Sequence, residues 1–408
     1  MFSGVVVAGR VRLEGFLSEG GFGQVYIARD LHTNATAAAK IERLDCVLPL
    51  LVKEAKCLQE LDRLSRAQGK SFLPKFYCAG NTVHFRYMLM ELCGRNVREL
   101  KKFTLFDRFS VHTSLWIAKQ MLEAVQFMHC NGWIHRDIKP PNFCISINGT
   151  PRRLILIDFG TVERRQDTTK TVGFCGTERY ASLRTHLKLS AHESDDLWAI
   201  YYIAVENING QLPWRKCVSR EEIARQKRIL VENPNFIFDR APHPWFPIMR
   251  VPFSLKIFLR LLACGHFNFT YPTPQHYEYI IAQIERDLVE LNFNDIHSLL
   301  DWEMPISAIP VTMPTTTSVY APQIPINVAS MHAYQLTHSS AQQQHYHQQH
   351  QHYNCLAQPF MVDVVGTSPY HHQNQHQHYQ HHQQQYHLNA AKDVRTAPLM
   401  QLPPPFYV

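Results

Sequence analysis

The pattern of apolar and polar positions predicts a strand-rich beginning to the chain. Strand-like runs within the first 90 residues occupy positions 5–16, 24–29, 35–42 and 87–91. Residues 50–64 differ, because the apolar residues Leu50, Leu51, Leu58 and Leu61 recur near helical spacing. This segment predicts an amphipathic helix that packs on a sheet.

Beyond Gly94 the pattern becomes helical. Ser110 is the predicted N-cap of a helix that runs to Cys130, and residues 195–209 predict a second, mostly buried helix. The longest apolar stretch, residues 197–205, is far shorter than the roughly 20 residues that span a bilayer. We therefore expect an α+β domain over residues 1–303, with a small β-rich lobe at about 9–92 and a large α-rich lobe at about 93–303.

The composition changes abruptly near Met304, which predicts a domain boundary. Residues 304–408 are rich in His, Gln and Pro and hold few aliphatic side chains, so we expect a disordered, low-complexity tail. Pairs such as His345/His347 and His376/His378 could bind a metal ion, but biased composition explains them better. We assign no metal site to the tail.

Charge and cysteine content narrow the classes of partner. The formal charge is +7, and the excess lies before Met304, because the four charges after it cancel. A moderately basic domain suits nucleotides or acidic peptides, or it only aids solubility. No dense Lys/Arg run is interleaved with aromatic residues, so nucleic acid is not an expected partner.

Ten cysteines without a C-x-x-C pair predict reduced thiols, and no signal peptide is recognisable. We expect a monomer that does not bind a membrane. Its expected location is the cytoplasm, with the nucleus as a second location.

A glycine-rich turn lies between two predicted strands, in the run Ser18-Glu-Gly-Gly-Phe-Gly-Gln-Val25. Gly20, Gly21 and Gly23 would let the backbone approach the phosphates of a nucleotide. By itself this signal is weak, and an ordinary glycine-rich hairpin is the alternative.

Lys40 ends a run of small apolar residues seventeen positions after Gly23, where a structural role for its charge is not obvious. Glu54 lies on the predicted helix fourteen residues later, where its carboxylate could hold the Lys40 ammonium toward the α- and β-phosphates. Two unrelated surface residues are the alternative, but their spacing from the glycine turn favours the pair.

The segment His135-Arg-Asp137-Ile-Lys139-Pro-Pro-Asn142 matches H-R-D-x-x-x-x-N at every fixed position. Asp137 can orient an attacking hydroxyl and accept its proton, and Lys139 can neutralise charge on a transferred phosphoryl group. Asn142 offers an oxygen to Mg²⁺. A short apolar run then delivers Asp158-Phe-Gly, whose carboxylate is the predicted principal magnesium ligand.

This ordered set resembles the protein kinase superfamily over about residues 9–300. Within it, the chain resembles the casein kinase 1 group, and residues 210–216 point toward its tau-tubulin kinase branch. The carriers are Lys139-Pro-Pro-Asn-Phe143, Gly176-Thr-Glu-Arg-Tyr-Ala-Ser182, Asp195-Asp-Leu-Trp198 and Gly210-Gln-Leu-Pro-Trp-Arg-Lys216.

The resemblance implies a two-lobed protein kinase fold that uses ATP and Mg²⁺. Asp196 would brace the catalytic loop, Met90 would be the gatekeeper, and Glu91 to Cys93 would form the hinge beside adenine. Thr177 and Arg179 would contact the substrate. The implied nucleotide-binding residues are Ser18, Gly20, Gly21, Gly23, Val25, Lys40, Glu54, Met90, Glu91 and Cys93.

Three departures from the family pattern stand out. Ser18 replaces the first loop glycine, Pro141 precedes Asn142, and Arg184 stands where the group usually has Asn, which leaves the support of the substrate loop in doubt. None removes a predicted charged group. A catalytically inactive pseudokinase or scaffold is the alternative function, and a small-molecule kinase of related fold is disfavoured by residues 176–182.

The expected activity is transfer of the γ-phosphate of ATP to Ser or Thr hydroxyls of proteins, with Lys139 favouring these over tyrosine. Arg179 could bind acidic or phospho-primed substrates, with Arg225, Lys227 and Arg228 adding to the same anion site. The alternative is that Arg179 only pairs with a nearby carboxylate, such as that of Glu178 or Glu193. Cytoskeletal substrates follow from resemblance alone. Phosphorylation of Thr168, Thr169 or Thr171 stays open, and ordinary solvated threonines are the favoured reading.

Overall fold

The computed structural model describes most of the predicted domain and none of the predicted tail beyond Met304. Within the domain it describes residues 2–21, 23–104, 107–147, 152–165, 173–232, 251–263, 272–295 and 297–304. The tail pairs His345/His347 and His376/His378 and the threonines at 168, 169 and 171 lie outside these residues. The domain boundary near Met304 stays a prediction.

An antiparallel sheet forms the first lobe. Its spatial order is β1 (Val6–Val7), β2 (Val11–Gly20), β3 (Gly23–Asp30), β4 (Thr36–Arg43), β6 (Phe85–Met90) and β5 (Phe76–Asn81). The single strand predicted at 5–16 is wrong. Ala8 and Gly9 take left-handed φ values of +49° and +72°, so the chain turns there between β1 and β2. Strand β5 was missed because its residues do not alternate in polarity.

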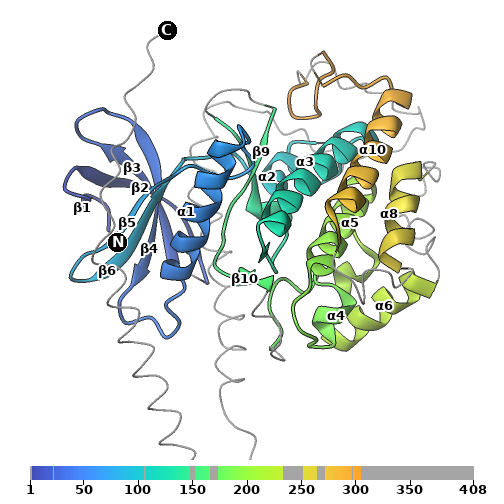
Figure 1. Ribbon diagram of the computed structural model, residues 1–408, viewed down its shortest axis with the longest axis horizontal. Coiled ribbons are helices and arrows are strands. Elements are labelled where there is room, and N and C mark those ends of the chain that lie inside the picture. The colour runs from blue at the N-terminus through green and yellow to red at the C-terminus, as the bar shows by residue number, and fades with distance from the viewer. Residues whose placement is uncertain are drawn as a thin grey trace, which may run out of the picture. The chain divides into compact units, whose positions relative to one another are not determined.

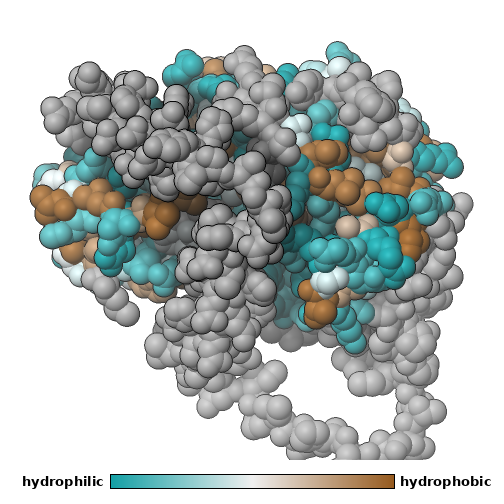
Figure 2. All heavy atoms as spheres, turned by 90° about the horizontal axis from the view of Figure 1, so that it is seen from below, coloured by the Kyte–Doolittle hydropathy of each residue, from teal (hydrophilic) through white to brown (hydrophobic). Residues whose placement is uncertain are grey.

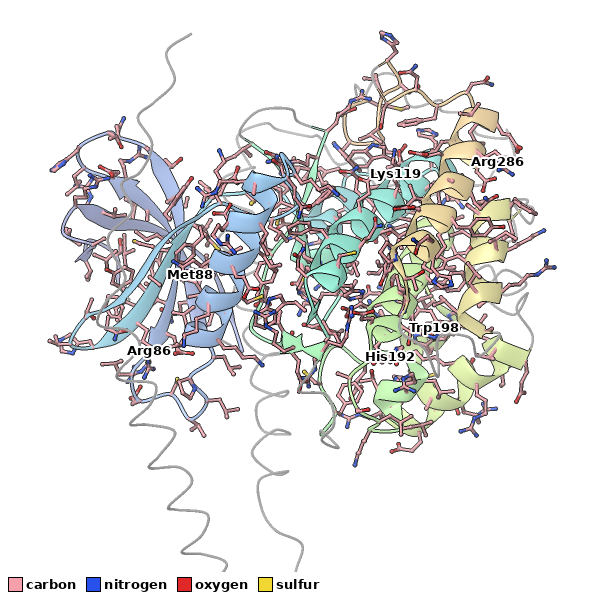
Figure 3. The ribbon with its side chains drawn as sticks, in the orientation of Figure 1. Arg86, Met88, Lys119, His192, Trp198 and Arg286 are labelled. Carbon is pink, nitrogen blue, oxygen red and sulfur yellow. The ribbon has the colours of Figure 1, made fainter. Side chains whose placement is uncertain are left out.

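Helix α1 (Leu51–Ala67) packs on this sheet, as the apolar spacing predicted. Leu51, Leu58 and Leu61 are buried in the same cluster as Met88 of β6, and Figure 3 labels Met88 on the strand facing this helix. The first turn is capped from the sheet, because Glu42 Oε1 accepts the backbone N–H groups of Leu50 (2.7 Å) and Leu51 (2.9 Å).

Helices build the second lobe (Figure 1). Those within the described residues are α2 (Val97–Lys101), α3 (Val111–Cys130), α4 (Leu183–His186), α5 (Glu193–Asn209), α6 (Arg220–Glu232), α8 (Phe253–Ala263) and α10 (Pro274–Glu290). The expected N-cap of α3 is confirmed, since Ser110 accepts a hydrogen bond from the Thr113 N–H. Helix α5 begins two residues before the prediction, with His192 as its N-cap. The two-lobed α+β fold is confirmed.

The core of the second lobe lies between α3, α5 and α10. Residues 193–208 of α5 are all buried, so the long apolar run is a core helix as predicted. Among the described helices, none combines the length and apolar character that crossing a membrane requires. Figure 2 shows apolar side chains dispersed among polar ones on the described part of one face.

Two short sheets frame the catalytic segment. Strand β7 (Trp133–Ile134) pairs with β10 (Glu163–Arg164), and β8 (Phe143–Ile145) pairs with β9 (Leu154–Leu156). Residues 135–142 therefore form a loop that is anchored by a strand at each end, and the residues after β9 return to the same place. The segments that carry Asp137 and Asp158 thus lie side by side, with the Ile157 N–H donating to the Asn142 carbonyl over 2.8 Å, although 21 positions separate the two aspartates in the sequence.

Candidate active site

Lys40 joins three separate parts of the chain. Its Nζ lies 2.7 Å from both carboxylate oxygens of Glu54 on α1 and 2.9 Å from Oδ1 of Asp158, which follows β9. The Lys40 and Glu54 side chains are buried, whereas the Asp158 side chain is 26% exposed. The pairing expected from sequence spacing is present, and Asp158 is brought to the same ammonium group.

Burial and charge oppose each other in this cluster. Burial by itself would lower the pKa of Lys40, but the carboxylates of Asp158 and Glu54 outweigh it and hold the pKa above its usual value. Burial would raise the pKa of Asp158, yet Lys40 outweighs it and lowers this pKa to about 2. At Glu54 burial outweighs the attraction of Lys40, so its pKa is raised. Asp158 is therefore ionised at neutral pH.

The Asp137 carboxylate is held by one contact on each oxygen. Thr177 Oγ1 donates to Oδ1 over 2.7 Å, and the Lys139 ammonium donates to Oδ2. The Asp137 carbonyl accepts a 3.0 Å hydrogen bond from Asn142 Nδ2. Asp137 is nearly buried, at 7% exposure. The structure thus brings Asp137, Lys139, Asn142 and Thr177 together.

Asp196 at the start of α5 holds the backbone of the catalytic loop. Its carboxylate accepts the N–H groups of His135 and Arg136, each over 2.8 Å, and a third contact comes from His129 Nε2 at 2.9 Å. Burial would raise the pKa of Asp196, but the hydrogen bond to His129 and the other donors lower it. The contacts expected of Asp196 are present, and His129 is a partner that the sequence did not reveal.

Phe159 fixes the turn that carries Asp158. It is 1% exposed, its ring meets the His135 ring edge-on at 5.8 Å, and its N–H donates to Glu54 Oε1 over 3.2 Å. Asp158 itself has a left-handed φ of +68°, an uncommon conformation for a non-glycine residue. Such strain persists where neighbouring contacts hold it, and here the bond from Lys40 to Asp158 and the bond from the Phe159 N–H to Glu54 do so.

The glycine turn is also the turn of the β2–β3 hairpin. Gly20 lies opposite Gly23, and Ser18 lies opposite Val25. Gly23 has φ +127°, and a Cβ there would approach the Ile41 carbonyl oxygen to 2.2 Å, so the fold itself demands this glycine. A Cβ at Gly20 would meet only open space. The turn of an ordinary hairpin and the predicted nucleotide-binding loop are therefore the same segment, and the two interpretations do not exclude each other.

The predicted hinge leaves the sheet at the end of β6. Met90 is buried and lies opposite Ala38 of β4. Glu91 donates its N–H to the Lys75 carbonyl over 2.9 Å, and its carboxylate accepts the Lys75 N–H, so its side chain faces the protein. Cys93 Sγ lies 3.8 Å from the Glu91 carbonyl oxygen.

Residues 176–182 form a loop that packs directly on the catalytic segment. Gly176 has φ +101°, and a Cβ there would lie 2.5 Å from the Arg136 carbonyl oxygen. The end of the loop is fixed by Ser182, whose hydroxyl donates to Asp195 Oδ1 over 2.6 Å. Arg184 lies beside this contact, with Nε 3.7 Å from the same carboxylate. The end of the loop is therefore held in place, although Arg184 stands where the family usually has Asn.

The anion site expected around Arg179 is only partly assembled. Arg179 Nη1 lies 3.5 Å from Glu206, a buried carboxylate of α5, and the alternative partners Glu178 and Glu193 pair instead with Arg220 and Arg165. The Arg179 side chain remains 39% exposed. Its role in substrate binding therefore stays a prediction.

The expected contribution of Lys227 is wrong. Its side chain is completely buried, and its ammonium donates to the backbone carbonyls of Glu178 and Ala181 and contacts His186. Burial lowers the pKa of Lys227 well below its usual value. These bonds support residues 176–182 from the buried side of the loop, where a substrate cannot reach the lysine. Arg225 pairs with Glu222 on an exposed face of α6.

Comparison with known proteins agrees with this geometry. A sequence model of the protein kinase domain matches residues 12–260. A probable serine/threonine-protein kinase of Dictyostelium discoideum is 33% identical over 248 residues, which cover 59% of this chain and 49% of that protein. A putative casein kinase I of Caenorhabditis elegans is 33% identical over 240 residues, covering 56% of this chain and 69% of that protein. The chain thus spans about half of the first relative. Because the kinase model covers more than half of the chain and the ordered site lies within it, the chain belongs to the protein kinase family.

Proposed function

We propose that the chain is a serine/threonine protein kinase that transfers the γ-phosphate of ATP to protein hydroxyls. The observation that carries the proposal is the Asp137 carboxylate, whose two oxygens are oriented by Thr177 and Lys139. Lys139 also helps to lower the pKa of Asp158, so the predicted base and the predicted metal ligand share one electrostatic environment.

The proposed reaction needs a base but no covalent intermediate. The substrate hydroxyl oxygen forms a bond to the γ-phosphorus while the bond from that phosphorus to the bridging oxygen breaks, and ADP leaves. Asp137 orients the hydroxyl and accepts its proton. The Lys139 ammonium offsets the negative charge of the transferred group, and Lys40 holds the α- and β-phosphates.

The residues present fit the magnesium ions that protein kinases generally use. Asp158 stays ionised because its pKa is about 2, and only its Oδ1 is bonded to Lys40. The nitrogen of the Asn142 amide is occupied by the Asp137 carbonyl, so its oxygen is the atom left for a cation. One carboxylate and one amide oxygen, completed by substrate phosphates, suit a magnesium site. When bound, the metal would neutralise phosphate charge.

The substrate class is the finer part of this proposal. Lys139 two residues after Asp137 supports serine or threonine as acceptor, and the exposed guanidinium of Arg179 supports acidic or phospho-primed sequences. The similarity to a putative casein kinase I of Caenorhabditis elegans supports a casein kinase 1 type of enzyme. The tau-tubulin branch and cytoskeletal substrates rest on residues 210–216 alone.

The test is phosphotransfer from ATP to a generic acceptor peptide by the purified chain and by Lys40→Met, Asp137→Asn and Asp158→Ala. Each substitution should lower the rate by about a thousandfold or more, because each removes several kcal/mol of transition-state stabilisation. Thermal unfolding checks that each variant folds. Wild-type turnover by Asp137→Asn would contradict the assignment, and nucleotide binding by the unmodified chain without turnover would favour the scaffold alternative.

A further inference from the structure

Three consecutive residues after the Asp158-Phe-Gly turn each form an ion pair with a different part of the protein. The pairs are Glu163 with Arg136 of the catalytic loop, Arg164 with Glu60 of α1, and Arg165 with Glu193 of α5. The segment 161–165 is thereby attached to the helix that carries Glu54 and to the helix that carries Asp196. None of these three ion pairs has a role in the phosphotransfer proposed above.

Both side chains of the Glu163–Arg136 ion pair are largely buried. The two side chains are 13% and 14% exposed, whereas Arg164 and Glu60 are each about one-third exposed. An exposed pair contributes little, but removing one partner of an enclosed pair leaves an uncompensated charge in poor contact with water. Loss of the Glu163 carboxylate should therefore disturb Arg136 far more than loss of an exposed partner would.

Arg136 is where several parts of the site meet. Its N–H donates to Asp196, its carbonyl oxygen lies against Gly176, and Asp137 follows it directly. Its φ is +72°, a left-handed conformation that an arginine holds only when surrounding contacts impose it. A displacement of Arg136 would therefore move the Asp137 carboxylate and the loop that carries Thr177.

The backbone places Glu163 beside the catalytic loop independently of its charge. In the β7–β10 pair, Glu163 lies opposite Ile134, and the hydroxyl of Thr161 donates to the His135 carbonyl over 2.9 Å. The carboxylate is thus supplied by a segment that is already hydrogen-bonded to the residues before Arg136. No anion from solution is needed to neutralise the guanidinium.

We propose that Glu163 is a positioning residue that neutralises Arg136 from within the chain and thereby holds Asp137 and Thr177 in their bonded arrangement. Without this carboxylate, Arg136 would require an external anion to keep the same place. The inference rests on the proposed kinase function for its activity readout, but its structural consequence can be measured separately.

The first experiment compares the whole chain with Glu163→Ala, the isosteric Glu163→Gln and the control Asp45→Ala. Asp45 also pairs with an arginine, Arg43, but both side chains are about 70% exposed and lie outside the site. We expect kcat to fall about tenfold in both Glu163 variants with the KM for ATP unchanged. Sodium acetate should restore part of the activity of Glu163→Ala, and sodium chloride at equal ionic strength should not. Activity equal to that of Asp45→Ala, or no recovery in acetate, would overturn the inference.

The second experiment follows hydrogen exchange of the peptide that covers residues 133–137. The N–H groups of His135 and Arg136 are bonded to Asp196, so they should exchange faster in Glu163→Ala and Glu163→Gln than in wild type or Asp45→Ala. This readout needs no turnover. If the wild-type chain transfers no phosphate, the proposed function fails while exchange still decides the role of Glu163, and unchanged exchange overturns it.

Discussion

The Thr177 hydroxyl donates a 2.7 Å hydrogen bond to Oδ1 of Asp137, although 40 residues separate the two in the sequence. Gly176 makes this approach possible, because any larger residue there would collide with the Arg136 carbonyl. The orientation of the predicted base is therefore set jointly by the catalytic loop and by the loop expected to receive the substrate.

Thr177→Ala should lower kcat about tenfold on a serine-containing peptide, because Asp137 loses one of the two groups that orient it. Thr177→Ser keeps the hydroxyl and should stay within about threefold of wild type. The check is steady-state kinetics of the three proteins at saturating ATP. If the serine variant were as impaired as the alanine variant, the methyl group and not the hydrogen bond would be the important feature.

Asp195 should make the domain less stable as the pH rises through the mildly acidic range. Burial outweighs the hydrogen bonds from Ser182 and His192 and raises the pKa of this carboxyl to about 6, against 3.8 as its ordinary value. A group whose folded pKa is raised contributes stability below its unfolded pKa and loses it as the pH passes the folded pKa. The loss between about pH 4 and pH 6 should amount to about 2–3 kcal/mol.

Urea unfolding of wild type and Asp195→Asn at about pH 4, 5 and 6.5 measures this effect. The free energy of unfolding of wild type should fall relative to that of the variant, which cannot ionise at this position. A constant difference across the range would show that Asp195 titrates near its ordinary value in the folded protein.

Residues 297–303 should be required for the stability of the second lobe, whereas residues 304–408 should not. The Asp301 carboxylate accepts the N–H and the hydroxyl of Ser110 over 2.6 and 2.7 Å, and Trp302 packs against Phe109 and Trp116. Leu300 is completely buried. Removing these contacts exposes apolar surface and takes away the acceptor of the Ser110 N–H and hydroxyl at the start of α3, which should cost several kcal/mol, on the order of 3 or more.

The measurement compares thermal unfolding and phosphotransfer of residues 1–303, residues 1–295 and the whole chain. We expect 1–303 to unfold and react like the whole chain and 1–295 to melt at a clearly lower temperature. Loss of cooperative unfolding in 1–303 would place the domain boundary beyond Met304.

Arg179→Ala should lower kcat/KM about tenfold, near 1.4 kcal/mol, on a peptide that carries a priming phosphate. The exposed guanidinium can donate two charge-assisted hydrogen bonds to a phosphate. The effect on the unphosphorylated peptide should be much smaller. Glu206→Gln provides the opposite change, because it removes the carboxylate that lies 3.5 Å from Arg179 and should raise the preference for the primed peptide.

Both variants are assayed on the same peptide with and without the phosphate. Equal losses on the two peptides in Arg179→Ala would mean that Arg179 and Glu206 together support the loop and do not recognise substrate charge.

The sequence by itself determined the order and chemistry of the predicted site. Lys40, Glu54, Asp137 and Asp158 could be assigned from spacing, because each lies at the end of a short apolar element or on a helix with a clear apolar face. Periodicity also located α1, α3 and α5. It missed β5 and merged β1 with β2, because short strands carry little periodic signal and the turn at Ala8 depends on backbone conformation.

Apart from the Lys40–Glu54 pair, only the tertiary structure decided which charges meet. Arg179 pairs with Glu206 of α5, and Lys227 is buried beneath the loop whose anion site it was expected to extend. Glu163 pairs with Arg136, 27 residues earlier in the sequence. Spacing along a chain predicts partners on one helix face, but without a recognised motif it does not predict which side chains packing brings together from separate segments. Burial adds a second effect, since the same ammonium that would attract a substrate in water becomes a structural donor once it is enclosed.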